Sequence, residues 1–410
     1  MPTIEQQALA YHALGQPGKI AIQVTKAVTN SADLALAYSP GVAAPCLAIQ
    51  KDPAKAYEYT SKGNLVAVIT NGTAVLGLGN IGALASKPVM EGKAVLFKKF
   101  AGVDAFDIEI DETDPEKLVE IIAALHPTFG GINLEDIKAP ECFYVERQLR
   151  ERLSIPVFHD DQHGTAIVVG AGLINAIVLT GRDIADIKVV CSGAGAAAMA
   201  CLDMLVDIGV QRKNVIVCDS RGVITTKRTL TAEKQLWAQD TIATTLSQVI
   251  EGADVFLGLS GPGLLTQDDV RTMAARPIIF ALANPEPELR PELIREVAPD
   301  AIIATGRSDY PNQINNALCF PYLFRAALDC AASTINQDMK RACVVALAEM
   351  AQGDSDFGSD YIVPTLLDPR LLTSVTPKIA AAAFDSGVAG RQLDKALYTA
   401  QLSALALTLI

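Results

Sequence analysis

The apolar positions of the chain fall into short runs and long helical runs that alternate. Short apolar runs bounded by glycine, proline or asparagine predict buried strands, and the longer runs between them predict helices. The expected strands are residues 65–69, 104–110, 155–158, 187–191, 214–219, 253–260, 277–282 and 301–304. Strands that alternate with helices form parallel sheets covered by helices, so the pattern predicts an α/β fold.

One segment after the first strand predicts a hairpin. Asn71-Gly72 is a strong turn signal, and Val75-Leu76 would be the return strand. The following Gly77-Leu-Gly79-Asn-Ile-Gly82 has the glycine spacing of a dinucleotide-binding turn. It would follow a hairpin rather than a strand of a βαβ unit, so we interpret it as a close-packed turn.

A second glycine-rich turn has the context that a dinucleotide site needs. Gly193 and Gly195 follow a predicted strand, and Ala198 lies in the first turn of the next predicted helix. Glycine permits the tight bend and the close approach of a pyrophosphate, and a small residue lets the helix pack on the strand. Asp219 ends the next strand and suits the ribose of NAD, whereas Arg221 suits the 2′-phosphate of NADP. The local sequence predicts NAD(P) binding and leaves the choice open.

The chain changes character near residue 163. We expect residues 1–162 to form an N-terminal α/β domain for substrate and catalysis, and residues 163–330 to form a doubly wound, Rossmann-type parallel sheet that binds NAD(P). Residues 331–410 should form helices that complete the cofactor domain, and their apolar end is a candidate interface. Ligands bind at the carboxyl ends of the strands of such a sheet, which places Asn284 and the Asn315-Asn316 pair in the cleft.

Two pairs of adjacent carboxylates follow short apolar runs. They are Glu135-Asp136 and Asp160-Asp161, and no basic residue separates the members of either pair. Four such carboxylates repel one another unless a cation lies among them. Neighbouring side chains on a strand point to opposite faces, so Glu135 and Asp136 can reach one ion only if the strand has already ended. An oxygen-rich site suits Mg²⁺ or Mn²⁺.

Tyr38 and Lys93 are candidate proton-transfer groups. Tyr38 begins a loop fixed by two prolines and a glycine, and Lys93 lies in the otherwise apolar helical run from Met90 to Phe97, which favours a lowered pKa. A packed tyrosine and a snorkelling lysine are the alternative interpretations. A metal that chelates a 2-hydroxy acid acidifies its hydroxyl, and oxidation followed by loss of CO₂ then needs a base and an acid.

Composition narrows the class of partner. The chain has 410 residues, of which 50% are hydrophobic, and a net charge of −12. This charge argues against nucleic acid or an anionic membrane as the main partner. The eight cysteines are scattered singly without a C-x-x-C pair, which favours a reduced, cytoplasmic protein. We expect no signal peptide and no membrane span.

Several motifs resemble those of the bacterial malic enzymes, and most of all the malic-enzyme portion of the larger NADP-linked type. The resemblance runs from about residue 17 to about residue 390. It depends on residues 37–42, 77–82, 91–93, 133–136, 159–165, 283–285 and 315–316. It implies oxidative decarboxylation of L-malate to pyruvate and CO₂ with reduction of NADP, with NAD as an alternative, and it implies a homodimer.

The same resemblance implies roles for the acidic residues and for Lys93. Glu135, Asp136 and Asp161 would bind Mg²⁺ or Mn²⁺. Lys93 would be the general base with Asp160 as its charged neighbour. The histidines beside the second acidic pair would then belong to the loop rather than to the metal.

Further roles fall on Tyr38 and three asparagines. Tyr38 would be the general acid. Asn284 and Asn316 would contact malate, while Asn284 and Asn315 would line the nicotinamide side of the same cleft. The run at Gly77 would be a turn of the substrate domain.

The sequence departs from the family pattern in two respects. Animal-type malic enzymes carry an arginine just before the Gly-Leu-Gly turn that pairs with a malate carboxylate, and here that region holds Ala74. We expect another cation to replace it, with Lys26, of the same or a partner subunit, as the candidate. The longest relatives append a phosphotransacetylase-like domain, which we expect to be absent here together with its regulation.

Two other functions remain open from the residues. One is a metal-dependent dehydrogenase that acts on another 2-hydroxy acid without decarboxylation. The other is a non-catalytic dinucleotide-binding regulator, which would be free to lose Tyr38, Lys93 and the carboxylates.

Overall fold

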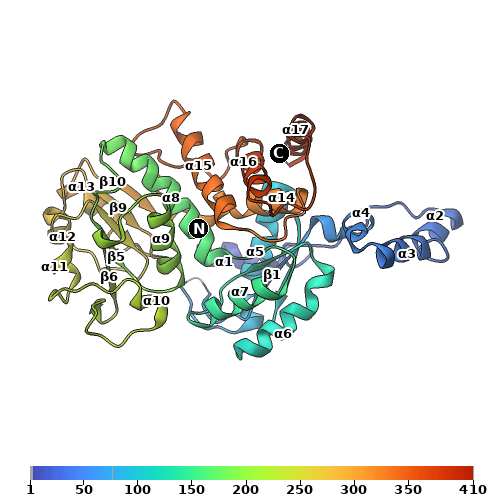
Figure 1. Ribbon diagram of the computed structural model, residues 1–410, viewed down its shortest axis with the longest axis horizontal. Helices are drawn as coiled ribbons and strands as arrows, with labels where there is room; N and C mark the ends of the chain where they lie inside the picture. Colours follow the sequence, from blue (N-terminus) through green and yellow to red (C-terminus); the bar gives the residue numbers. More distant parts are fainter. Residues whose placement is uncertain (1–2, 76, 410) are drawn as a thin grey trace.

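The computed structural model describes residues 3–75 and 77–409, and it contains two parallel sheets flanked by helices (Figure 1). The four-stranded sheet has the order β2-β1-β3-β4, and all its neighbours are parallel. Its strands are β1 Leu65–Thr70, β2 Asp104–Glu109, β3 Gly131–Leu134 and β4 Val157–His159. The helices around it are α5 Ala83–Ala101, α6 Pro115–Leu125 and α7 Glu141–Arg152.

The six-stranded sheet has the order β10-β9-β8-β5-β6-β7. Its strands are β5 Val189–Ser192, β6 Val215–Asp219, β7 Gly222–Val223, β8 Val255–Gly258, β9 Ile278–Ala281 and β10 Ile302–Thr305. All neighbours are parallel except β6 and β7. The chain therefore winds outwards from β5 in both directions, which is the doubly wound arrangement expected from the sequence.

The remaining helices lie between these strands and at the two ends of the chain. The helices that precede or flank the strands are α1 Ile4–Ala13, α2 Ser31–Ala37, α3 Ala43–Lys51, α4 Ala56–Tyr59, α8 Asp160–Thr180, α9 Ala196–Asp207, α10 Ala232–Gln235, α11 Leu246–Ile250, α12 Gln267–Thr272 and α13 Pro291–Val297. The C-terminal helices are α14 Phe320–Asp329, α15 Gln337–Gln352, α16 Leu371–Asp385 and α17 Lys395–Leu409. The 3-10 helices are η1 Pro53–Lys55, η2 Ser61–Asn64, η3 His126–Thr128, η4 Arg212–Asn214 and η5 Asn316–Leu318.

The hairpin predicted after the first strand is wrong. The Asn71-Gly72 turn is present, because Gly72 has a φ of 68° and its carbonyl accepts the N–H groups of Ile81 and Gly82. Val75 makes only an isolated bridge to Gly79, and Leu76 lies outside the described residues. β1 continues through this loop into α5 and then pairs with β2 in parallel. The turn signal was correct, but it closes a loop between strand and helix rather than joining two strands.

Helix α8 connects the two sheets through the interior. It begins at Asp160, directly after β4, and ends at Thr180, with Gly181 as its C-cap at a φ of 69°. By length and composition α8 is apolar enough to cross a membrane, but 67% of its most apolar window is buried inside the protein. Ideal Cβ atoms on Gly170 and Gly172 would lie 3.2 Å from Met204 and 3.3 Å from Phe280, so both glycines permit close packing.

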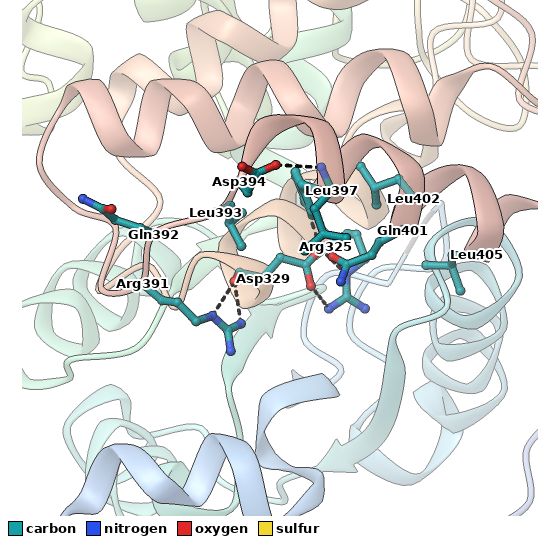
Figure 2. A pocket seen from close by; sticks show the side chains of 11 residues that line it. Arg325, Asp329, Arg391, Gln392, Leu393, Asp394, Leu397, Gln401, Leu402 and Leu405 are labelled. Atoms are coloured by element: carbon teal, nitrogen blue, oxygen red, sulfur yellow. Dashed lines mark hydrogen bonds and ion pairs between the residues drawn. The ribbon is translucent and has the colours of Figure 1, made fainter.

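The C-terminal helices pack on the four-stranded sheet as well as on α8. The Phe97 ring of α5 meets the Phe320 and Phe324 rings of α14, with centroids 4.7 and 5.3 Å apart. A cavity of about 510 Å³ is lined by residues of α14, of α17 and of the loop before α17, and Figure 2 shows the side chains that line it. There Arg325 donates to the carboxylate of Asp329, and Arg391 donates to its carbonyl oxygen. The Tyr398 hydroxyl of α17 also donates to the Asp329 carboxylate over 2.8 Å, and this contact attaches the last described helix to α14.

Residues 20–60, which we call the N-terminal arm, project away from both sheets. Figure 1 shows α2 and α3 at the far end of this projection. None of the described residues in α1 to α4 is buried. Large apolar side chains on the arm are exposed, including Leu36 at 76% and Leu47 at 64%. The described part of the chain therefore does not cover these apolar side chains of the arm.

Candidate active site

The two pairs of carboxylates lie together at the carboxyl edge of the four-stranded sheet. Leu134 of β3 lies opposite His159 of β4 in parallel register, so the residues that follow both strands emerge side by side. β3 ends at Leu134, and Asp136 has a φ of 54°, which turns the backbone out of the extended conformation. Aspartate tolerates this left-handed region better than most residues. The predicted end of the strand before the second acid is confirmed.

Three of the four acids form a cluster suited to a metal ion. Ligand oxygens of Glu135, Asp136 and Asp161 all lie within 4.8 Å of one another. The backbone N–H of Asp136 donates to Asp161 Oδ2 over 2.7 Å, which fixes the two loops against each other. Glu135 and Asp136 are buried, whereas the Asp161 side chain is 34% exposed. The cluster is therefore open to solvent on the side of Asp161.

The electrostatics of this cluster agree with a divalent cation. Burial raises the pKa of Glu135 to about 7 and the pKa of Asp161 to about 6, because desolvation disfavours the charged carboxylates. Carboxylates held so close need positive charge to remain ionised together. The donor set consists of oxygen atoms alone, which suits Mg²⁺ or Mn²⁺ rather than zinc. These residues therefore fit the predicted metal.

Lys93 reaches the cluster from α5. Its Nζ lies 2.5 Å from Asp160 Oδ2 and 2.9 Å from Glu135 Oε1, and 4.3 Å from the centre of the Phe320 ring. Burial lowers the pKa of Lys93, but attraction to Asp160 and Glu135 outweighs that effect, and the net pKa is raised. The predicted lowering of this pKa is wrong. Its sequence neighbours are apolar, but other elements bring two carboxylates to the amine.

Asp160 occupies the first residue of α8, and Gly164 one turn later makes room for it. A Cβ on Gly164 would lie 2.0 Å from Asp160 Oδ1 and 2.8 Å from the Cβ of Asn316. Asn316, the first residue of η5, is therefore packed against the start of α8. The structure thus brings Asp160, Asp161 and Asn316 together around one helix turn.

A buried polar network supports the same turn from behind. His163 Nε2 lies 2.8 Å from Glu146 Oε1, and the backbone N–H of His159 donates to the same oxygen over 3.3 Å. Lys340 Nζ lies 3.4 Å from His163 Nδ1. Burial raises the pKa of Glu146, but attraction to His163 and other cationic groups outweighs it and lowers this pKa to about 2. These contacts hold His159 and His163 in place behind the acidic cluster.

Sequence reasoning missed Glu146 and Asn133. Glu146 lies on the buried face of α7 with Cys142, Val145 and Leu149, and a charged residue at such a position was a visible signal. Asn133 Nδ2 donates to Glu135 Oε2 over 2.8 Å and fixes the metal-side carboxylate. A polar residue within the buried strand β3 was the corresponding signal.

Tyr38 does not join Lys93 within one chain. It caps the end of α2 on the N-terminal arm and is 71% exposed. Lys26, the candidate replacement for the missing arginine, is an exposed residue of the same arm. Tyr38, at the end of α2, is thus separated from the acidic cluster by the projection of the arm.

The cofactor turn has the predicted strand–turn–helix geometry. Gly193 follows β5 with a φ of 124°, and a Cβ there would lie 2.4 Å from the carbonyl oxygen of Leu259, so only glycine fits. Gly195 is the N-cap of α9, and Ala198 is buried in its first turn. A cavity of about 550 Å³ opens at this turn and is bounded by Gly193, Gly195, residues of β6 and the loop that follows β8.

Asp219 lies in this cavity at the end of β6, with two cations beside it. Arg228 Nη2 donates to Asp219 Oδ2 over 2.7 Å, and Lys234 Nζ donates to the same oxygen over 3.2 Å. Burial raises the pKa of Asp219, but the hydrogen bonds outweigh it and lower the pKa to about 2. The Arg221 side chain is exposed, and Arg221 is not among the described residues that line the cavity.

The remaining asparagines lie where the two sheets meet. Asn284 follows β9, and a Cβ on Gly77 would lie 2.9 Å from its carbonyl oxygen. The glycine-rich loop of the first sheet therefore contacts the Asn284 turn of the second. Asn315 caps η5, since its Oδ1 accepts the N–H of Ala317 over 2.9 Å, and it precedes Asn316.

Comparison with known proteins identifies the family. Residues 17–150 match the malic enzyme N-terminal domain, and residues 162–386 match the malic enzyme NAD binding domain. The chain is 60% identical to the NADP-dependent malic enzyme of Escherichia coli over 95% of this chain and 54% of that protein. It is 57% identical to the NAD-dependent malic enzyme of Rhizobium meliloti over 95% of this chain and 53% of that protein. The chain thus spans about half the length of these curated relatives.

A solved structure matches over nearly the whole length. The malic enzyme from Pyrococcus horikoshii shares 43% sequence identity and a TM-score of 0.93, with 99% of this chain and 96% of that chain covered. The two domain matches together cover more than half of the sequence, in the order of the two sheets. The chain belongs to the malic enzyme family.

Proposed function

We propose that the chain catalyses the oxidative decarboxylation of L-malate to pyruvate and CO₂ with reduction of NADP and with Mg²⁺ or Mn²⁺ as the metal. One observation carries the proposal: a buried lysine lies against a three-carboxylate cluster. Lys93 contacts Glu135 of this cluster and also Asp160 beside it. Asn316 packs against the same turn of α8 as Asp160. The names of the relatives support malate as the substrate, and they include both NADP-dependent and NAD-dependent enzymes.

In this proposal Glu135, Asp136 and Asp161 hold the metal. A bound Mg²⁺ or Mn²⁺ would compete with Lys93 for Glu135, acidify the malate hydroxyl and stabilise negative charge on its oxygen. By drawing Glu135 away, the cation would also lower the pKa of Lys93, so that a neutral amine could accept the hydroxyl proton. Asp160, whose Oδ2 lies 2.5 Å from Lys93 Nζ in the metal-free structure, would hold the resulting ammonium. Asn284 and Asn316 orient malate through hydrogen bonds, and Asn315 holds the short helix that carries Asn316.

Tyr38 supplies the second proton, to the carbon left by CO₂, and it does so from a second copy of the chain. The support is geometric: the arm carries Tyr38 away from its own cluster and exposes an apolar surface that a second copy would cover. The functional unit would then be a homodimer in which the arm of each subunit completes the active site of the other subunit. Lys26 lies on the same arm and would bind the malate carboxylate in the active site of the partner subunit.

Mixing two inactive variants tests this exchange. Tyr38→Phe and Lys93→Met should each abolish activity alone. Co-expressed, they should restore about a quarter of wild-type activity, because half of a random C₂ population is mixed and each mixed dimer has one intact site. Absence of any recovery, with mixed dimers demonstrated, would place Tyr38 outside the partner's site.

Product analysis tests the reaction itself. With malate and Mn²⁺, NADPH, pyruvate and CO₂ should form in equal amounts, and chelation of the metal should stop all three. Accumulation of a keto diacid without CO₂ would favour a simple dehydrogenase. Failure to reduce either nucleotide would favour a dinucleotide-binding regulator.

We also propose a cytoplasmic location. All eight cysteines are free thiols, and seven of them are buried. Such thiols agree with a reducing compartment. Fractionation of cells that express the tagged chain would test this location.

A further inference from the structure

One fully buried carboxylate takes no part in the proposed proton transfers or in the metal cluster. Glu288 lies between β9 and α13, in the same loop as Asn284, and it is 0% exposed. Removing a carboxylate from water is costly unless other groups of the protein donate hydrogen bonds to it. The donors that Glu288 has found therefore indicate what it does.

The donors to Glu288 are backbone groups of two different loops. Its Oε1 accepts the backbone N–H of Ser260 over 3.1 Å, and its Oε2 accepts the backbone N–H of Ala283 over 3.1 Å. Ser260 follows β8, whereas Ala283 follows β9 and directly precedes Asn284. Because β8 and β9 are parallel neighbours, this one carboxylate bridges the carboxyl ends of two adjacent strands.

A glycine at the end of β8 makes room for this bridge. A Cβ on Gly258 would lie 2.4 Å from Cδ of Glu288 and 2.6 and 2.7 Å from its two carboxylate oxygens. Any side chain at this position would displace the carboxyl group. The carboxyl group thus lies directly against the backbone of β8, where both of its oxygens reach their donors.

The two bridged loops border the ligands of the proposed reaction. Ser260 and Gly261 line the cavity of about 550 Å³ that begins at Gly193. In such a fold the pyrophosphate lies at the glycine turn and the adenosine half lies over β6, so the nicotinamide half lies on the side of β8 and β9. The other bridged loop carries Asn284, the predicted contact of malate.

On the basis of the proposed function, we propose that Glu288 is a positioning residue that holds the nicotinamide side of the cofactor cavity and the turn at Asn284 as one unit. Because the two N–H groups share one carboxylate, a movement of either loop breaks the bridge. The nicotinamide half of NADP and malate then meet loops that are already ordered, which lowers the cost of binding both. The adenosine half lies over β6 and is not affected.

Binding of ligands to the full chain, followed by calorimetric titration, tests this role without turnover. In Glu288→Gln the amide NH₂ faces one of the two N–H donors, so one of the loops is released. Loss of a buried charged hydrogen bond should weaken NADP by about 10-fold or more, whereas 2′,5′-ADP, the adenosine half alone, should change by less than about twofold. Oxalate, a dicarboxylate with no hydride to transfer, should also bind more weakly when Mg²⁺ is in excess.

Two further variants complete the comparison. Gly258→Ala displaces the carboxyl group of Glu288 without removing it, so it should weaken NADP and spare 2′,5′-ADP in the same way. Glu286→Gln is the matched control, because Glu286 lies in the same loop but pairs with Arg290 and Arg307 at the surface. It should leave all three affinities unchanged, since ion pairs at the surface contribute little.

The outcomes separate this inference from the proposed reaction. An NADP affinity within about twofold of wild type in Glu288→Gln, or equal weakening of NADP and 2′,5′-ADP, would overturn the role of Glu288. If Glu288→Gln does not fold, as judged by its melting temperature, Gly258→Ala decides in its place, and failure of both to fold would make Glu288 a folding residue instead. A wild-type chain that binds NADP but does not oxidise malate would contradict the proposed reaction alone.

Discussion

Replacing Gly164 by alanine should disable the Lys93–Asp160 pair with little effect on folding. The added Cβ would lie 2.0 Å from Asp160 Oδ1 and 2.8 Å from the Cβ of Asn316, so both side chains must move. Non-bonded carbon atoms rarely approach an oxygen closer than about 3 Å, so the carboxylate must retreat by about 1 Å from its present position, 2.5 Å from Lys93 Nζ. With an effective dielectric constant of about 20, the attraction falls from about 7 to about 5 kcal/mol. A loss of about 2 kcal/mol in positioning the proposed base corresponds to a roughly 30-fold lower kcat.

The assay compares turnover with stability. Alanine is favoured over glycine inside a helix by about 1 kcal/mol, which offsets part of the steric cost, so the melting temperature should change little. Malate-dependent NADPH formation with Mn²⁺ measures kcat. Gly170→Ala is the matched control, since it adds the same methyl group to α8 and its nearest contact would be the flexible Met204 side chain at 3.2 Å. A kcat within about twofold of wild type in Gly164→Ala, or an equal loss in Gly170→Ala, would refute the reasoning.

Two further predictions concern the metal cluster, and a third concerns the arm. Burial raises the pKa of Glu135 to about 7 and the pKa of Asp161 to about 6. The metal-free folded protein therefore retains protons that the unfolded chain releases above about pH 4. Its unfolding free energy should fall as the pH rises through about 4 to 7. Because Mn²⁺ needs the ionised carboxylates, its stabilisation of the melting temperature should be larger near pH 8 than near pH 5, and a pH-independent shift would contradict this. Lys26→Ala should raise the KM for malate by about 10-fold through loss of a charged contact, and an unchanged KM would exclude Lys26.

The sequence predicts most of the fold because burial determines the strands directly. The apolar runs at residues 65–69 and 278–281 are strands in which every residue is buried. The loop after β1 was mispredicted because the Asn71-Gly72 turn signal is local. Whether the returning chain pairs as a strand depends on which partners the rest of the sheet supplies, and β1 is already flanked by β2 and β3.

The site was less predictable because it depends on contacts between distant segments. The proximity of Glu135, Asp136 and Asp161 could be inferred, since both pairs follow strands that end at the same edge. The raised pKa of Lys93 could not, because local sequence shows its apolar neighbours and not the carboxylates that approach from β3 and α8. The separation of Tyr38 from Lys93 was equally hidden, since a linear motif does not show that its segment projects from the body.

The central claim is that Asp161 is a ligand of the divalent ion, whereas its neighbour Asp160 is the ion-pair partner of Lys93. Titration of the chelator-treated protein with Mn²⁺, followed by the magnetic resonance signal of the free ion, tests this division directly. We predict a single tight Mn²⁺ site per chain in the wild type and in Asp160→Asn, and loss of that site in Asp161→Asn. Tight binding retained by Asp161→Asn, or lost in Asp160→Asn alone, would contradict the account.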